Sequence, residues 1–319
     1  MPTYDSIISR VTPPGTDPLV PEPLSNSIIQ ELPTHSAVLQ HARRIPMATR
    51  TQRMPVLDTL PQAYWVNGDS GLKETTSQEW GNVHLVVEEL AALVPVPDAY
   101  IDDANIPIWD EVRPRLVEAL AQKIDAACLF GVNKPSTWSP AIVTAALAAG
   151  NTVAANNQDI PLSVAELAEK VSLDGFTNIN GWLSRPGFAW RLLRVRSDGS
   201  GEPIYSPDLQ NSRGGNLYGY PMTEVRNGAW DPSVADLLVG DWSKAIIGMR
   251  QDITFSMSSE AVIADDDGKV IYSAFQQDGK IMRVVMRLAF ATANPVTVLN
   301  QNASTRYPFG VLTHGTASS

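Results

Sequence analysis

The spacing of hydrophobic residues predicts one long helix near the middle of the chain. Apolar residues recur there at three- and four-residue steps, the pattern of a single helix face. They are Trp109, Val112, Leu116, Leu120, Ile124 and Ala127. A helix over Ile108–Phe130 would begin with the acids Asp110 and Glu111, where the helix dipole favours anions, and stop at Gly131. Pro114 lies inside this pattern, so we expect either a kink or a start one turn later.

Two shorter helices are predicted further along. One would open at Ser163, with Glu166 as its capping-box partner. The other would follow Pro186 through PGFAWRLLRV and end in SDGSGEP.

Alternating positions predict a long β-hairpin before the long helix. Val83, Leu85 and Val87 occupy alternate positions, as the covered face of a strand requires. The sequence Gly-Asp-Ser-Gly at residues 68–71 separates two such arms and is typical of a turn. A two-stranded hairpin is not stable alone in water, so this one needs another surface to lie on.

The last third of the chain is strand-like, and the first fifty residues are not. KAIIGMRQDITFSMS and KIMRVVMRLAF are rich in β-branched and large apolar residues, and turn signals stand at Asp266–Gly268 and Gln277–Gly279. Residues 11–23 contain five prolines, typical of an extended arm, and Ser25–Gln40 suggests short helical turns interrupted by Pro33. The pattern as a whole predicts an α+β protein.

Composition narrows the class of protein. The 319 residues are 44% hydrophobic and 18% charged, a globular composition. No apolar run approaches the roughly 20 residues of a membrane span, and the N-terminus lacks the features of a secretory signal. Cys128 is the single cysteine, which excludes an internal disulfide and suits a reducing cytoplasm.

Charge is unevenly distributed. The formal net charge is -10, opposite in sign to that of a protein that wraps DNA through phosphate contacts. Yet His41–Arg53 contains four arginines and no acid, whereas Asp69–Asp125 contains twelve acids and four bases. These stretches are either ordinary solvated faces or complementary patches that meet between copies of the chain.

Five sequence blocks, in order, carry a resemblance to a known family. The blocks are Lys123–Ala127 followed by Gly131, Gly181–Ser184 with Ser197–Gly199, Leu217–Met222, Val239–Ala245 with Arg250, and Phe275–Asp278 with Arg283 and Arg287. Together with the order of elements, they make the chain similar to the HK97-type major capsid proteins of tailed bacteriophages, from about Leu24 to about Leu299.

The resemblance implies an HK97-like capsid fold in four parts. Residues 1–50 would form an N-terminal arm that reaches over a neighbour, and residues 51–97 an extended β-hairpin loop that lies on the adjacent subunit. Residues 98–138 and 241–300 would form a peripheral domain with a long spine helix and long strands. Residues 139–240 and 301–319 would form an axial α/β domain and the C-terminal tail.

The function implied is that of a shell subunit rather than an enzyme. Copies would assemble as pentamers and hexamers into the icosahedral head of the virion, enclosing double-stranded DNA without sequence-specific binding. Assembly would take place in the host cytoplasm, with a separate scaffolding protein and a portal and with no membrane. An encapsulin-like nanocompartment shell is the alternative within the same fold.

We expect subunit contacts at charged and aromatic residues on the predicted arm, loop and helix. The candidates are Arg43, Arg44, Arg50, Arg53, Trp65, Lys73, Trp80, Asp110, Glu111 and Arg250.

Two departures from the family are expected. The proline-rich arm begins almost at Met1, so a fused scaffolding segment would be absent or already removed. Some members join subunits by an isopeptide bond between a loop lysine and an asparagine. Lys73, with Asn294 or Asn300, is the available pair, but no assisting glutamate can be named, so we expect no cross-link.

Catalytic and metal-binding interpretations find little support in the sequence. Ser70 lies in a Gly-Asp-Ser-Gly sequence like that of trypsin-like proteases, but Leu72 stands where the oxyanion turn needs glycine. A serine hydrolase is therefore a weak third hypothesis. The four histidines form no metal motif, Asp265–Gly268 lacks the other ligands of a calcium loop, and no nucleotide-binding loop occurs. We expect no catalytic, cofactor or metal site.

Overall fold

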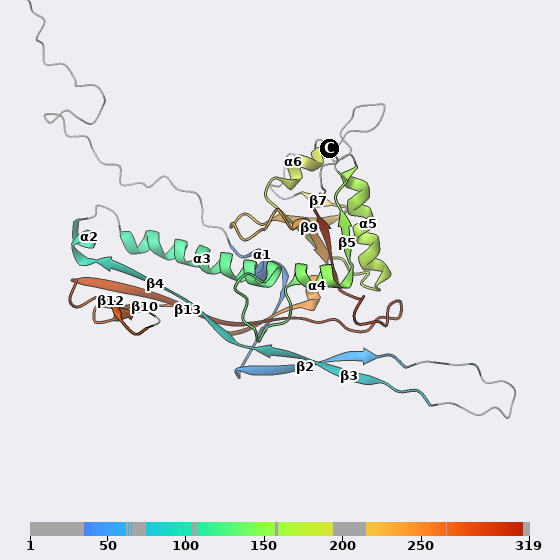
Figure 1. Cartoon of the computed structure of the whole chain (residues 1–319), viewed down its shortest axis with the longest axis horizontal. Helices are drawn as coiled ribbons and strands as arrows, with labels where there is room; N and C mark the ends of the chain where they lie inside the picture. The colour runs from blue at the N-terminus through green and yellow to red at the C-terminus, as the bar shows by residue number, and fades with distance from the viewer. Residues whose placement is uncertain are drawn as a thin grey trace, which may run out of the picture.

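The computed structural model describes residues 35–61, 63, 65, 75–103, 107–156, 159–193, 215–265 and 267–314. Helices and strands are mixed throughout this part of the chain, as the hydrophobic pattern predicted (Figure 1). A four-stranded sheet and a six-stranded sheet organise the described residues, and two separate two-stranded hairpins accompany them.

The four-stranded sheet contains the longest strands. Its order is β1-β10-β13-β4. The strands are β1 (Arg43–Pro46), β4 (Glu88–Pro97), β10 (Ala245–Ser258) and β13 (Gly279–Thr292). β10 and β13 are antiparallel neighbours and coincide with the two strand-like stretches of the last third. β1 runs parallel to β10 and pairs only with its first part, up to Met249.

β4 belongs to this sheet and not to the hairpin before it. The sequence assigned the whole range 51–97 to the hairpin loop, but Glu88–Pro97 pairs with β13 from Leu288 to Gly279. The alternation continues across Val87 without a turn signal, so the sequence did not show where the hairpin ends. Leu90, Ala92 and Val94 of β4 pack against the long helix.

The long helix α3 (Ile108–Phe130) has the predicted bounds. It begins at Ile108 and continues through Pro114, so the later start is wrong. Leu116 and Leu120 pack against Met282 and Val284 of β13, which fixes the helix on one face of the four-stranded sheet. Gly131 has φ 77° and ends the helix in the left-handed conformation that glycine adopts readily.

The six-stranded sheet has the order β5-β14-β9-β6-β8-β7. Its strands are β5 (Thr152–Ala154), β6 (Gly181–Ser184), β7 (Asn216–Leu217), β8 (Tyr220–Glu224), β9 (Ala235–Gly240) and β14 (Phe309–Thr313). Every residue of β6 and β9 is buried. β14 lies between β5 and β9, so residues 309–313 form an internal strand of this sheet.

Five more short elements join or cover the sheets. They are α1 (Ala37–His41), α2 (Asp98–Asp103), α4 (Ile142–Ala149), α6 (Phe188–Leu193) and the 3-10 helix η1 (Trp242–Lys244). α6 is the described part of the helix predicted after Pro186.

Helix α5 (Ile160–Leu173) starts earlier than the sequence predicted. Asp159 is its N-cap, and its carboxylate accepts a bond from the Leu162 amide at 3.1 Å. Ser163 is instead buried inside the first turns, where its hydroxyl donates to the Asp159 carbonyl at 3.2 Å. The predicted capping box at Ser163 is therefore wrong, because an earlier residue supplies the cap.

Two hairpins complete the fold. β2 (Thr51–Thr59) and β3 (Glu79–Val86) are antiparallel, which confirms that this region forms a hairpin. β11 (Val262–Ala264) and β12 (Val270–Ser273) form the second one across the predicted Asp-Asp-Gly turn.

Some predicted features lie outside the described residues. They are the proline-rich arm, most of the hairpin tip with Ser70 and Lys73, and the segment after α6 with its SDGSG sequence.

Candidate subunit-contact surfaces

The hairpin β2–β3 is attached to the rest of the subunit at its base. Leu85 and Val87 are buried there against Met47, Ile246 and Ala289, and Met54 and Val83 pack at the edge of the same cluster. Alternate residues of β2 are half-buried on one side and exposed on the other. The sequence alternation therefore reflects a strand covered by its own subunit near the base only.

Beyond this base the hairpin extends away from both sheets (Figure 1). Trp80 on β3 is 62% exposed, and Trp65 is fully exposed. Exposure of a large indole ring to water is energetically unfavourable. These side chains gain free energy when another surface covers them.

The structure brings the candidate arginines together beside the hairpin base. Arg43 and Arg44 lie on β1, Arg50 in the turn that follows and Arg53 on β2, and all four are exposed. Arg250 joins them from β10, because its guanidinium donates to the carbonyls of Met47 (3.3 Å) and Ala48. A basic surface therefore surrounds the root of the hairpin.

Asp110 and Glu111 lie at a different end of the four-stranded sheet. They stand in the first turn of α3, close to α2, which follows directly on β4. Asp110 forms an exposed ion pair with Arg113 at 3.7 Å. The ten residues of β4 separate this end from the hairpin base, and at about 3.4 Å per residue they span roughly 34 Å. The basic and acidic candidates thus occupy opposite ends of one sheet.

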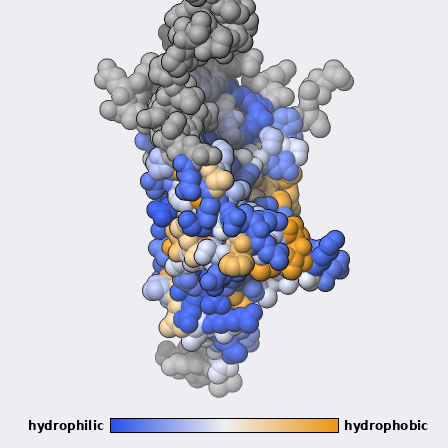
Figure 2. Space-filling view, turned by 90° about the vertical axis from the view of Figure 1, so that its left-hand side faces the viewer, coloured by the Kyte–Doolittle hydropathy of each residue, from blue (hydrophilic) through white to orange (hydrophobic). Residues whose placement is uncertain are grey.

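The same acidic end carries exposed apolar side chains. Val262, Val270, Ile271 and Phe275, from the hairpin β11–β12 and the turn after it, are each more than half exposed. Figure 2 faces this end of the molecule and shows hydrophobic residues gathered on one side of a mostly hydrophilic surface. A contiguous patch of this kind marks an interaction surface more often than isolated apolar residues do.

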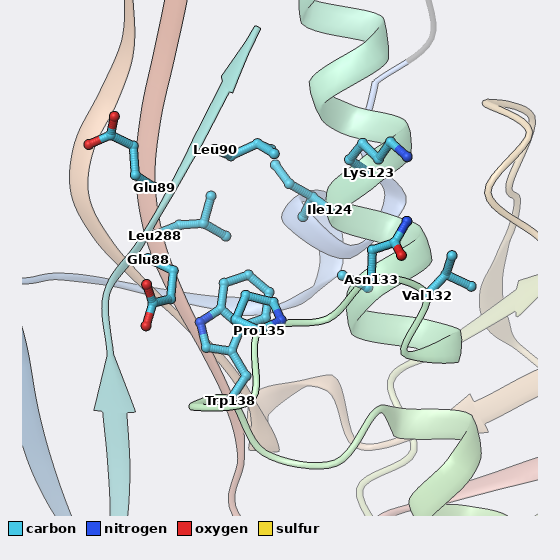
Figure 3. Close-up of a pocket in the computed structure, with 11 residues that line it drawn as sticks. Glu88, Glu89, Leu90, Lys123, Ile124, Val132, Asn133, Pro135, Trp138 and Leu288 are labelled. Atoms are coloured by element: carbon cyan, nitrogen blue, oxygen red, sulfur yellow. The ribbon is translucent and has the colours of Figure 1, made fainter. Parts of the chain in front are cut away.

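A pocket of about 240 Å³ lies between the end of α3 and the strands below it (Figure 3). Lys123 and Ile124 form one wall, and Glu88, Glu89 and Leu288 form the other. The carboxylates already have partners: Glu88 accepts a bond from the Thr137 hydroxyl at 2.8 Å and Glu89 pairs with Arg287 at 3.3 Å. Among the described residues that line this pocket there is no serine, cysteine or histidine to act as a nucleophile or base.

A buried carboxylate joins three distant segments of the chain. Asp125 on α3 accepts bonds from the Ser36 hydroxyl (2.5 Å), the Ala37 amide (2.9 Å), the Val38 amide (3.1 Å) and the Asn227 side chain (2.6 Å). Burial raises the pKa of Asp125 above its ordinary value, although these hydrogen bonds act in the other direction. Sequence analysis missed this role, because the donors lie 87 or more residues away along the chain.

A second buried acid connects the six-stranded sheet to the segments that follow β6 and β14. Asp236 on β9 is fully buried and pairs with Arg185 (3.1 Å), Arg191 (2.5 Å) and His314 (3.3 Å). The two arginines come from the β6–α6 region and the histidine from the end of β14. Asp125 and Asp236 thus stabilise the fold, and the carboxylate oxygens of both already bind partners within the subunit.

Metal and membrane sites receive no support from the geometry. Across the described ranges, no group of three or more His, Cys, Asp or Glu residues could hold a metal ion. No helix in that part of the chain is long and apolar enough to span a membrane.

Comparison with known proteins gives one consistent result. A model described as the phage capsid family matches residues 16–299. The major capsid protein of Staphylococcus phage 80alpha is 23% identical over 273 residues, which cover 84% of this chain and 79% of that protein.

Solved structures agree with the family match. A chain from Microbacterium phage Oxtober96 has a TM-score of 0.81 and 36% identity, over 92% of this chain and 96% of that one. A chain from Mycobacterium phage Adephagia has a TM-score of 0.82 and 30% identity, over 98% of this chain and all of that one.

Proposed function

This chain belongs to the phage capsid family and is a major capsid protein of the head shell, and from that premise we propose that the hairpin β2–β3 is its principal contact with the next copy in the shell. The family and the structural neighbours consist of structural proteins, not enzymes. They favour the phage head over a nanocompartment or a serine hydrolase.

The exposed hairpin is the observation that carries the proposal. A closed shell needs contacts in which one patch meets a different patch on the next copy, so that the contact repeats around a ring. The hairpin is covered by its own subunit only at the base, and its exposed residues include Trp65 and Trp80. Lying on a neighbour would cover these rings and the open edges of both strands.

The charge distribution supports a head-to-tail arrangement. The arginines at the hairpin base (Arg43, Arg44, Arg50 and Arg53) and the acids at the start of α3 (Asp110 and Glu111) lie at opposite ends of one subunit. In a head-to-tail arrangement, the basic end of one copy would meet the acidic end of the next. Opposite charges at such a contact favour the correct partner and register.

The two sheets suggest separate roles within the shell. We assign α3 as the spine helix, and the four-stranded sheet with it as the peripheral domain. The six-stranded sheet with α4, α5 and α6 would be the axial domain, which gathers around the five- and six-fold axes. The predicted arm of residues 1–50 is too long, because α1 and β1 pack within their own subunit; the proline-rich residues 11–23 would be the part that reaches a neighbour. This division is our proposal from the family resemblance and the packing of each unit around its own core.

The remaining partners are also proposals. Copies would form pentamers and hexamers with the help of a separate scaffolding protein and a portal, in the host cytoplasm. The shell would enclose double-stranded DNA without reading its sequence, since the net charge of -10 does not favour tight phosphate binding.

A charge-swap experiment tests the proposed contact. Arg53→Glu alone and Asp110→Arg alone should each lower the yield of closed shells in sedimentation, because each variant places like charges together. The double variant should recover much of the yield. Arg53→Lys, which keeps the positive charge at the same position, is the control and should assemble normally. A double variant no better than either single one would contradict the proposed pairing of these two ends.

A further inference from the structure

An apolar groove runs along the side of α3 that faces β10, and we propose that residues 24–32 of the same chain occupy it. The groove begins as a cavity of about 320 Å³ between the two elements. Its apolar lining includes Val117 and Leu120 of α3 and Ile253 of β10, and Arg44 and Asp252 are also among the lining residues. This proposal goes beyond the shell contact above and does not depend on it.

The groove continues past this cavity along β10. Phe255 and Met257 pair with Val284 and Met282 of β13, whose side chains pack against α3. Residues opposite each other on neighbouring strands project from the same face of a sheet, so Phe255 and Met257 also face the α3 side. They are 39% and 46% exposed. Three apolar side chains of β10, at 253, 255 and 257, therefore form an open row beside the helix.

This part of β10 is also an open edge of the sheet. β13 pairs with one side of β10 along most of its length, but β1 pairs with the other side only up to Met249. Among the described residues, no strand pairs with that side beyond Met249. An added segment therefore has room beside this row.

The described chain starts at the mouth of the groove. His35 and Ser36 line the cavity directly. Asp125 holds this end in place, since it binds Ser36, Ala37 and Val38. A segment that directly precedes His35 would therefore need no linker to reach the groove.

The preceding sequence has the apolar spacing that the groove requires. Leu24, Ile28 and Leu32 recur every four residues, a spacing that would put them on one side of a helix. Asn26 and Gln30 fall on the other side. One apolar side can thus face the groove while the polar side faces water.

The spacing of the segment matches that of the strand. Four helical residues advance about 6 Å, at about 1.5 Å each, and two strand residues advance about 7 Å, at about 3.4 Å each. With the segment running away from His35, Leu32 would lie beside Ile253, Ile28 beside Phe255 and Leu24 beside Met257. The segment would lie antiparallel to β10 and cover its exposed row.

Disulfide formation tests this placement directly. Cys128 is buried on α3 and is the single native cysteine, so two introduced cysteines report without interference. In the variant that combines Ile28→Cys with Phe255→Cys, the two cysteines should form a disulfide within one chain under mild oxidation by glutathione disulfide. Ile28→Cys with Thr254→Cys is the matched control, because Thr254 neighbours Phe255 but pairs with Val285 on the opposite face. We expect bonding at Phe255 to exceed that at Thr254 several-fold, in assembled shells and in dissociated subunits.

A second measurement covers the case in which the cysteine variants fold poorly. Removing residues 1–33 should raise the rate of peroxide oxidation of Met257 several-fold in peptide mass spectra, while Met54 on the hairpin should keep its rate. The proposal is overturned if Met257 reacts at the same rate with and without the segment. It is also overturned if both cysteine pairs bond equally, or if the disulfide joins two chains and thereby assigns the groove to a second copy.

Discussion

The hairpin β2–β3 and the six-stranded sheet use their hydrophobic residues in opposite ways. β6 and β9 are buried at every position, and Leu183, Leu238 and Val239 have no exposed surface. On the hairpin, Leu85 is buried at the base, but Trp80 is 62% exposed. One region is complete within a single subunit, and the other leaves apolar surface for a second molecule to cover.

This contrast separates two kinds of stability. Burial within the six-stranded sheet contributes to folding of the subunit, whereas burial of the hairpin beyond its base contributes only when copies associate. Changes in the first region should therefore lower the free energy of unfolding. Changes beyond the hairpin base should lower assembly and leave folding almost intact.

Loss of a core aromatic residue should have the largest effect on folding. Phe309 of β14 is fully buried and packs edge-on against Trp242 at 5.1 Å between ring centroids. Phe309→Ala should lower the free energy of unfolding by about 3–5 kcal/mol, measured by urea denaturation of dissociated subunits. An effect below about 1 kcal/mol would show that this sheet is not the folding core that its burial suggests.

Removal of the buried carboxylate on α3 should come next. Asp125→Ala leaves the amides of Ala37 and Val38 and the Asn227 side chain without their acceptor. We expect a loss of roughly 3 kcal/mol, since each unsatisfied buried donor costs about 1–3 kcal/mol and some will find water. Asp125→Asn, which keeps one acceptor oxygen, should lose less. If Asp125→Ala and Asp125→Asn unfold at the same urea concentration as the native chain, the anchoring role is wrong.

The same carboxylate gives the folded subunit a pH dependence of definite sign. Burial raises the pKa of Asp125 above its ordinary 3.8, so the folded state binds this proton more tightly than the unfolded state does. Its contribution to stability is fully present below the unfolded pKa and is lost as the pH rises through the folded pKa. Relative to Asp125→Asn, the native chain should therefore lose stability as the pH increases above about 4. Urea titrations of both proteins across that range measure the difference, and a constant difference would contradict the shift.

Trp80→Ala on the hairpin should have the smallest effect on folding. The ring is mostly exposed in the subunit, so the free energy of unfolding should change by less than about 0.5 kcal/mol. Assembly should weaken, because each subunit both gives and receives the contact. Light scattering during assembly measures this, with Trp80→Phe, which keeps an aromatic ring at the same position, as the matched control. Equal assembly of the two variants would remove Trp80 from the contact.

Local sequence patterns were enough to predict much of this fold. Helix α3 was predicted because its apolar stripe continues over 23 residues, and β10 and β13 because each is long and rich in apolar residues. The N-terminus of α5 was misplaced, because a serine and a glutamate three residues apart imitate a capping box. The end of the hairpin was missed, because the alternation of β3 continues into β4.

Contacts between distant segments could not be predicted in this way. The bonds from Ser36 and Asn227 to Asp125 span 89 and 102 residues, and neither donor belongs to a recognisable motif. The insertion of β14 between β5 and β9 likewise depends on tertiary packing. The candidate arginines were named from charge alone, and the structure added that Arg250 lies beside their segment.

Sedimentation velocity of a chain with a shortened hairpin tests the central claim most directly. The variant replaces Val66–Gln78 with a two-residue Asn-Gly turn and leaves β2 and β3 intact. We predict a circular dichroism spectrum and a cooperative unfolding transition like those of the native chain, together with a large loss of closed shells in favour of subunits or small rings. Normal shells from this variant, or a chain that no longer folds, would contradict the claim that the hairpin serves assembly rather than the fold of its own subunit.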